Sequence, residues 1–137
     1  MHFELLEHPA DIGFRAYAQT FGELYVAAAH ALVSLILDSS RIEPKQDFVL
    51  RAEAGDFESL LVNWLNEVLY FVDSKRLALG SFEIVRVGKY NLECIARGEP
   101  RDPEKHPGKL VVKAVTYHQL KISQTSEGWF ADIYVDV

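Results

Sequence analysis

The chain has 137 residues, 49% of them hydrophobic and 25% charged, which is the composition of one ordinary globular domain with a single core. Acidic residues outnumber Lys and Arg by 20 to 14, and the resulting charge of −6 has the wrong sign for a surface that binds RNA phosphates. Because of this negative charge, we expect no stable direct binding of nucleic acid. The single cysteine, Cys94, excludes an intrachain disulfide and a cysteine-based zinc site.

The first third of the chain predicts two strands and a helix. Residues 3–7 form a short strand, and residues 12–19 alternate apolar and polar side chains, the pattern of a half-buried strand. Thr20 and Glu23 form a capping box, which predicts a helix from this point to about Leu37.

The rest of the chain predicts one more helix and mostly strands. Residues 48–52 indicate a strand, and Asp56 caps a helix whose apolar face extends to residue 72. Later strands are expected at residues 81–87, 90–98, 110–115, 118–124 and 129–137, the first two joined as a hairpin. Because the helices come early and the strands cluster late, we expect one α+β domain over residues 1–137. The economical arrangement is a two-layer sandwich, with two helices on one face of a mixed, mostly antiparallel sheet.

The chain lacks the features of an exported or membrane protein. No segment reaches the ~20 apolar residues that a membrane span requires. The first residues also lack the basic region of a signal peptide. We expect a cytoplasmic protein without a membrane partner.

Two acidic positions near the chain ends are candidate metal ligands. Asp11 lies where a turn containing Pro9 enters a strand, and it either hydrogen-bonds the turn or ligates a metal. At the other end an alternating strand continues to the last residue, which sets Asp136 beside the terminal carboxylate of Val137. If the two ends meet, the clustered oxygens suit a hard cation such as Ca²⁺ or Mg²⁺. Otherwise Asp136 is a solvated edge residue.

A polar loop between strands holds the next candidates, Asp102, Lys105 and His106. Such a loop is either a solvated connector or a contact loop that reaches a partner's nucleotide or acidic groups. Lys113 and His118 belong to a following strand, where histidine is more often half-buried than catalytic. A zinc hydrolase could be sketched from His8 with Asp11, His106 and His118, but no tight ligand spacing supports it.

Five segments in order along the chain resemble the motifs of the archease family. H-P-A-D-I-G at residues 8–13 resembles the opening motif H-T-A-D-x-G, and L-V-N-W-L-N-E at 61–67 resembles L-x-x-W-L-N-E. G-E-P-R-D-P-E-K-H at 98–106 is similar to G-E-x-x-D-P-x-K-H, and V-K-A-V-T-Y-H at 112–118 to V-K-A-[VI]-T-Y-H. V-D-V at 135–137 matches the family's acidic ending. Pro9, in place of the usual Thr, puts only the turn geometry in doubt.

The resemblance implies an accessory protein and not an enzyme. Its partner is then the RtcB-type RNA ligase, which joins RNA ends bearing a cyclic phosphate and a hydroxyl during tRNA splicing or RNA repair. The accessory protein promotes guanylylation of the ligase histidine, permits multiple turnover and broadens the use of nucleotides. A chaperone-like role towards a tRNA methyltransferase is the alternative partner assignment.

The resemblance also implies a divalent-cation site. Its ligands would be Asp11, Asp136 and Val137, and its ion Ca²⁺, with Mg²⁺ or Mn²⁺ as alternatives. We further expect Lys105 to act at the ligase active site as a mobile cation, with Lys113 as the second candidate. His8 and His118 are less certain members of the site.

Overall fold

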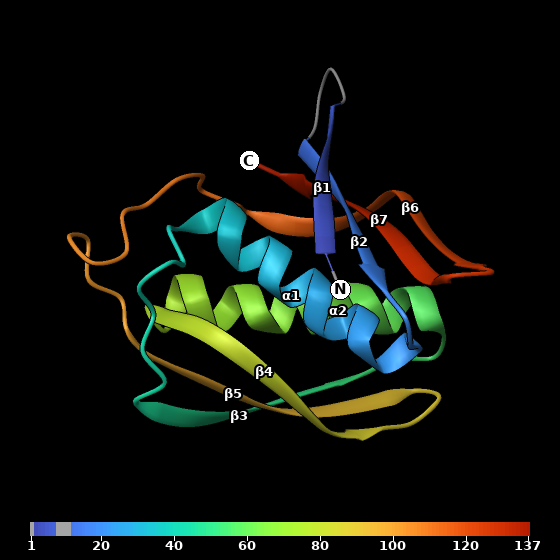
Figure 1. Cartoon of the computed structure of the whole chain (residues 1–137), viewed down its shortest axis with the longest axis horizontal. Helices are drawn as coiled ribbons and strands as arrows, with labels where there is room; N and C mark the ends of the chain where they lie inside the picture. The colour runs from blue at the N-terminus through green and yellow to red at the C-terminus, as the bar shows by residue number, and fades with distance from the viewer. Residues whose placement is uncertain (1, 8–11) are drawn as a thin grey trace.

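The computed structural model describes residues 2–7 and 12–137 (Figure 1). Its elements in chain order are β1 (His2–Glu7), β2 (Ile12–Ala18), α1 (Phe21–Ile36), β3 (Gln46–Glu53), α2 (Phe57–Leu69), the π-helical turn η1 (Tyr70–Ser74), β4 (Leu77–Val87), β5 (Asn91–Pro100), β6 (Ala114–Thr125) and β7 (Gly128–Asp136). The α+β class expected from the sequence is confirmed.

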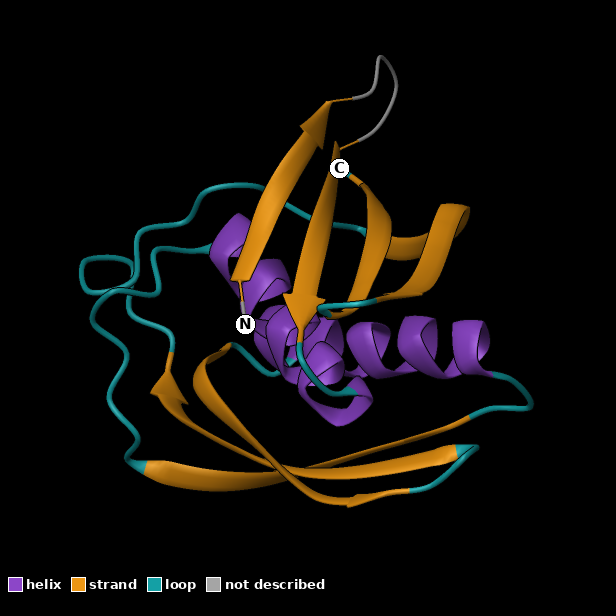
Figure 2. Ribbon diagram, turned by 45° about the vertical axis from the view of Figure 1, so that its right-hand side comes forward, coloured by secondary structure: helices purple, strands orange, loops and turns teal. Residues whose placement is uncertain are grey.

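The strands of the described residues form two separate antiparallel sheets. One has the order β1-β2-β7-β6 and the other β3-β5-β4. Helix α1 contacts β2 of the first sheet and β4 of the second, and α2 contacts β6 and β3. The two helices therefore lie between the sheets, as Figures 1 and 2 show.

This arrangement corrects the expectation of one mixed sheet with helices on a single face. The reason lies in α1, which buries ten of its sixteen residues, including the consecutive Ala27, Ala28 and Ala29. A helix that is apolar around most of its circumference cannot be covered from one side. Burying it requires a layer above and a layer below.

Both helix starts follow the caps expected from the sequence. Thr20 Oγ1 accepts a hydrogen bond from the Glu23 amide at 3.2 Å, and the Asp56 carboxylate accepts one from the Ser59 amide at 2.7 Å. Each cap satisfies an amide that the helix itself leaves unpaired. Helix α1 ends at Ile36, close to the expected Leu37, and α2 gives way to the η1 turn after Leu69.

One pair of expected strands is merged. Residues 110–113 lie outside the strands, and β6 is a single strand that includes the expected 118–124 segment. Its pairing with β7 is interrupted between Thr116 and Lys121, where Gln119 has φ of 52°. A non-glycine residue in this left-handed region marks a local irregularity of the strand. The gap expected between two separate strands is therefore an irregularity within one strand.

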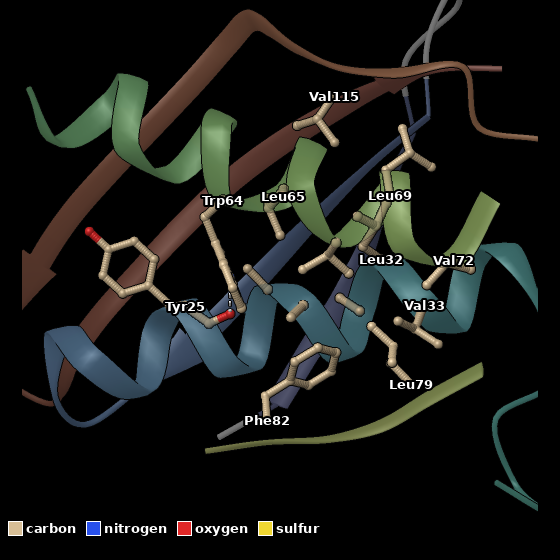
Figure 3. Close-up of a cluster of buried hydrophobic side chains, with 14 of the residues drawn as sticks. Tyr25, Leu32, Val33, Trp64, Leu65, Leu69, Val72, Leu79, Phe82 and Val115 are labelled. Atoms are coloured by element: carbon tan, nitrogen blue, oxygen red, sulfur yellow. Dashed lines mark hydrogen bonds between the residues drawn. The ribbon is translucent and has the colours of Figure 1, made fainter. Parts of the chain in front are cut away.

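The core is centred on Trp64 of α2, which is completely buried. Its indole Nε1 donates a hydrogen bond to the Tyr25 carbonyl of α1 at 2.9 Å, and its ring meets Phe82 of β4 edge-on (Figure 3). Leu32 and Leu65 fill the space between the helices. One aromatic side chain thus joins both helices to the three-stranded sheet. In the described part of the chain, no helix has the length and apolarity needed to cross a membrane.

Candidate functional site

Strand β7 ends at the first candidate site. Asp136 is the last strand residue and Val137 follows it, so the expected ordered chain end is confirmed. The Asp136 carbonyl accepts a hydrogen bond from the Lys113 amide at 2.8 Å, and Asp136 pairs with Ala114 of β6. The backbone of the chain end is therefore fixed by the neighbouring strand.

The side chains at this end face solvent. Asp136 and Val137 are both exposed, and among the described residues no hydrogen bond or ion pair engages the Asp136 carboxylate. A carboxylate on a fixed backbone is a hard oxygen donor, which fits Ca²⁺, Mg²⁺ or Mn²⁺ better than a thiophilic metal. Within residues 2–7 and 12–137, no three His, Cys, Asp or Glu side chains come close enough to hold a metal.

The opening motif reaches the same end of the sheet through its last residues. Asp11 and His8 lie outside the described residues. Ile12, the next residue in the chain, pairs with Val135, the residue before Asp136. The β2–β7 register therefore aligns the start of one strand with the end of the other.

The remaining candidates of this region lie on β6 or just before it. Lys113 is exposed and its amide contacts Asp136, as described above. His118 is exposed in the irregular part of β6, with its ring 6.2 Å from that of Tyr134. The Tyr134 ring in turn covers Gly13, where a Cβ atom would lie 2.5 Å from the ring. The lack of a side chain at Gly13 thus permits the close approach of the Tyr134 ring.

The loop of residues 101–108 packs against a buried carboxylate of β5 that was not among the predicted site residues. Glu99, at the end of β5, is only 4% exposed. Its carboxylate accepts three hydrogen bonds, each of 2.9 Å, from the Lys105 ammonium, the Glu43 amide and His106 Nε2. The Lys105 bond, then the Glu43 amide and the His106 ring, lower the pKa of Glu99 to about 2 despite its burial.

Lys105 is held by two carboxylates. Its ammonium also donates to Glu43 at 2.8 Å, and its side chain is 18% exposed. The bonds to Glu43 and Glu99 raise its pKa. In this chain Lys105 neutralises the buried Glu99, and its expected action at the ligase active site stays a prediction.

His106 is buried with 1% exposure, and its two nitrogens have different partners. Nδ1 accepts a hydrogen bond from the Asp102 amide at 3.0 Å, so Nε2 is the nitrogen that carries the proton and donates to Glu99. Asp102 is exposed, and its carboxylate accepts from the Glu104 amide at 2.9 Å. The solvated-connector interpretation thus fits Asp102 but not Lys105 or His106.

The structure brings the candidates together as two groups. Asp102, Lys105 and His106 form one group around Glu99, and Lys113 adjoins Asp136 in the other. Within residues 2–7 and 12–137, no hydrogen bond or ion pair joins the two groups. Sequence reasoning missed Glu99 and Glu43, although a glutamate seven residues before a histidine and six before a lysine was a usable signal.

Asn66 is a second residue whose role appears only in the structure. Its amide nitrogen donates to the Val115 carbonyl at 3.2 Å, and its amide oxygen accepts from the Val115 amide at 3.0 Å. The side chain therefore pairs with the backbone of β6 as a neighbouring strand would. It ties α2 to the segment that follows Lys113.

Comparisons with known proteins place the whole chain in one family. A model described as the archease protein family matches residues 3–137. The protein archease of Methanopyrus kandleri is 39% identical over 140 residues and covers 100% of both chains. That of Pyrococcus furiosus is 42% identical over 139 residues and covers 98% of each.

Solved structures share the fold. The solution structure of Methanobacterium thermoautotrophicum protein 1598 has a TM-score of 0.80 and 29% identity, covering 98% of both chains. A crystal structure from Thermotoga maritima, described as an archease and possible chaperone, has a TM-score of 0.69 and 20% identity, covering 96% of this chain and 94% of its own. The second likeness concerns the fold alone. The family match over residues 3–137 and the full-length relatives show that this chain belongs to the archease family.

Proposed function

We propose that this protein activates an RtcB-type RNA ligase by promoting guanylylation of the ligase histidine and multiple turnover. Membership of the archease family supports the proposal. The structural observation that carries it is the β2–β7 register, which pairs Ile12 with Val135. The last residues of the opening motif, Ile12 and Gly13, therefore lie beside the part of β7 that leads to Asp136.

The proposed site holds one divalent cation between Asp11, Asp136 and the Val137 carboxylate. The bond from the Lys113 amide keeps the Asp136 backbone in place, and the exposure of both terminal residues leaves them accessible to a partner. A bound Ca²⁺, Mg²⁺ or Mn²⁺ would supply positive charge with open positions for water or a phosphate oxygen. Asp136 and Val137 act by orienting and neutralising, without transferring a proton.

The charge of the chain supports a basic partner. A protein of charge −6 is attracted to an enzyme that binds RNA, whose surface must be basic. Such attraction raises the rate of encounter and weakens as salt is added. In this complex the ligase would bind the RNA, and this protein would bind the cation.

A guanylylation assay of the cognate ligase, with and without this protein, tests the proposal. We expect Asp136→Asn to reduce stimulation at least about tenfold, because losing a charged ligand weakens a hard-cation site strongly. It should also lose Ca²⁺ binding by calorimetry while remaining folded. Asp73→Asn, which removes an exposed carboxylate from η1, is the matched control and should behave as the parent.

Two results would contradict this proposal. If the parent protein leaves guanylylation and turnover of the ligase unchanged, the assigned partner is wrong. If Asp136→Asn and Asp11→Asn both bind Ca²⁺ and stimulate like the parent, the partner stands but the metal site is elsewhere.

A chaperone-like role towards a tRNA methyltransferase is the second candidate. The description of the Thermotoga maritima protein as a possible chaperone favours it, as do exposed apolar residues such as Leu5, Val111 and Tyr117, which are 61%, 74% and 56% exposed. Protection of the methyltransferase from thermal aggregation, without any effect on the ligase, would favour this role over the first.

A further inference from the structure

The outer face of the four-stranded sheet contains a row of aromatic rings. The strand register places His2 beside Tyr17, Tyr17 beside Phe130, and Phe130 beside Ser123. The His2 and Tyr17 rings are stacked with centroids 4.1 Å apart, and those of Tyr17 and Phe130 are 6.4 Å apart. The solvated face of an antiparallel sheet is normally polar, so three adjacent rings call for an explanation.

The next row of the same face carries four charges that cancel. It consists of Glu4, Arg15, Asp132 and Lys121. Arg15 forms two hydrogen bonds with Asp132, at 2.6 and 2.9 Å, and this pairing raises its pKa. The Arg15 guanidinium also lies over the Phe130 ring, 4.5 Å from its centroid. The cation is therefore already neutralised and has little to offer a phosphate, but its plane extends the aromatic surface.

The aromatic row borders a hollow of about 450 Å³. Tyr17, Phe130 and Trp129 line it with rings, and Gln19 and Ser126 line it with uncharged polar groups. The exposed Glu127 carboxylate also borders it and adds to the repulsion of a phosphate. The hollow is within the size range of small-ligand sites, and it offers stacking surfaces with a few hydrogen-bonding groups. An apolar protein partner would instead have to desolvate the neighbouring charged row without gaining compensating bonds.

We propose that this hollow binds a purine nucleobase, stacked on Tyr17 and on the Phe130–Arg15 platform. A base is planar and polarisable, and it carries amino and ring-nitrogen groups that Gln19 and Ser126 can pair with at its edge. Because the charges of the neighbouring row cancel, we expect the site to bind the base and not the phosphate. This site is compatible with the acidic charge of the chain, which opposes phosphate binding only.

The base can come from a free nucleotide or from an unpaired residue of RNA. Phe130 precedes Asp136 by six residues, roughly 20 Å along an extended strand at about 3.3 Å per residue. The nucleobase site is thus distinct from the proposed cation site. Its existence does not depend on the ligase proposal.

The first experiment maps binding on the intact parent protein by amide chemical shifts. We expect AMP and adenosine to perturb residues around 2, 17 and 130, and ribose 5-phosphate to perturb none of them. Binding of AMP should change little between low and high salt, because no phosphate is gripped. Perturbation by ribose 5-phosphate, or no perturbation of this face by adenosine at millimolar concentration, would overturn the proposal.

A single-stranded oligoadenylate of six residues identifies the source of the base. Binding at least about tenfold tighter than AMP indicates RNA, because neighbouring bases add stacking contacts, and equal binding indicates a free nucleotide. Either result supports the site. An RNA duplex whose bases are all paired should not compete, and competition by it would argue against stacking.

Two variants test the rings separately. Tyr17→Leu and Phe130→Leu retain apolar bulk but remove the stacking surface, and each should weaken AMP binding at least about fivefold. Tyr90→Leu, at an exposed tyrosine 45% accessible on the other sheet, is the matched control and should bind as the parent. Asp136→Asn should also bind AMP normally. Equal affinity of all four variants would place the ligand elsewhere.

Discussion

Glu99 shows how single residues determine the properties of the 101–108 loop. A carboxylate with 4% exposure is tolerated because three donors and the Lys105 charge compensate its loss of water. The same bonds immobilise Lys105, so a change at Lys105 leaves Glu99 under-compensated. A role of Lys105 at the ligase active site predicts that Lys105→Ala stimulates the ligase poorly, and this effect has to be separated from a loss of stability.

The Glu99 network should make stability depend on acid pH. The pKa of Glu99 is about 2 in the folded protein and 4.5 in its ordinary state, so the folded chain binds fewer protons between these values. The stabilisation is fully present above pH about 4.5 and is lost as pH falls towards 2. Glu99→Gln should lower the thermal midpoint at pH 7. The difference in thermal midpoint between this variant and the parent should shrink below pH about 4.5.

Circular dichroism melts between pH 3 and 7 would measure this difference. Glu104→Gln, at an exposed position of the same loop, is the control and should follow the parent throughout. A constant difference between Glu99→Gln and the parent across the range would show that Glu99 acts through packing and not through its charge.

At the scale of elements, α2 is joined to β6 by a side chain that substitutes for a strand. Asn66 meets both the amide and the carbonyl of Val115, immediately before the β6 irregularity. This contact holds the segment whose Lys113 amide supports Asp136. Helix α2 is therefore connected to Asp136, a candidate metal ligand, through residues 113–115.

Asn66→Ala should lower the free energy of unfolding by about 1–3 kcal/mol, because it leaves two part-buried backbone groups of Val115 without partners. Amides near the start of β6 should also exchange faster with solvent. Asn63→Ala removes one exposed hydrogen bond to the Glu53 carbonyl and should cost less, about 1 kcal/mol or below. Urea unfolding of both variants decides the matter, and equal losses would mean that the double contact has no special weight.

For the whole molecule, the central helices make the two sheets depend on one core. Leu50 of the three-stranded sheet and Ile133 of the four-stranded sheet both belong to the buried cluster around α1 and α2. Neither sheet can separate from the helices without exposing their apolar surface. We therefore expect one cooperative unfolding transition.

Leu50→Ala tests this coupling across the molecule. Emptying a fully buried site should cost about 2–5 kcal/mol, and it should speed hydrogen exchange of the slowest β7 amides, such as Ile133, by a corresponding factor. Val49→Ala, at the neighbouring exposed position, should change little. Unchanged exchange of β7 in a destabilised Leu50→Ala protein would show that the sheets unfold independently.

The sequence by itself determined the class of the fold, both helix starts and most strands, because caps, hairpin turns and residue periodicity are local signals. It also identified the family, since five ordered motifs span the chain, and the family models and relatives agree. Asp136 at the end of an ordered strand was predicted from alternation alone and is confirmed.

Only the tertiary structure decided how these parts combine. The division into two sheets depends on how α1 is covered, and the pairing of Ile12 with Val135 depends on contacts across 123 positions. The burial of Glu99 depends on donors from two segments, the Glu43 region and the 101–108 loop. The aromatic row likewise exists only because β1, β2 and β7 align His2, Tyr17 and Phe130. Such relations are long-range, and no local periodicity encodes them.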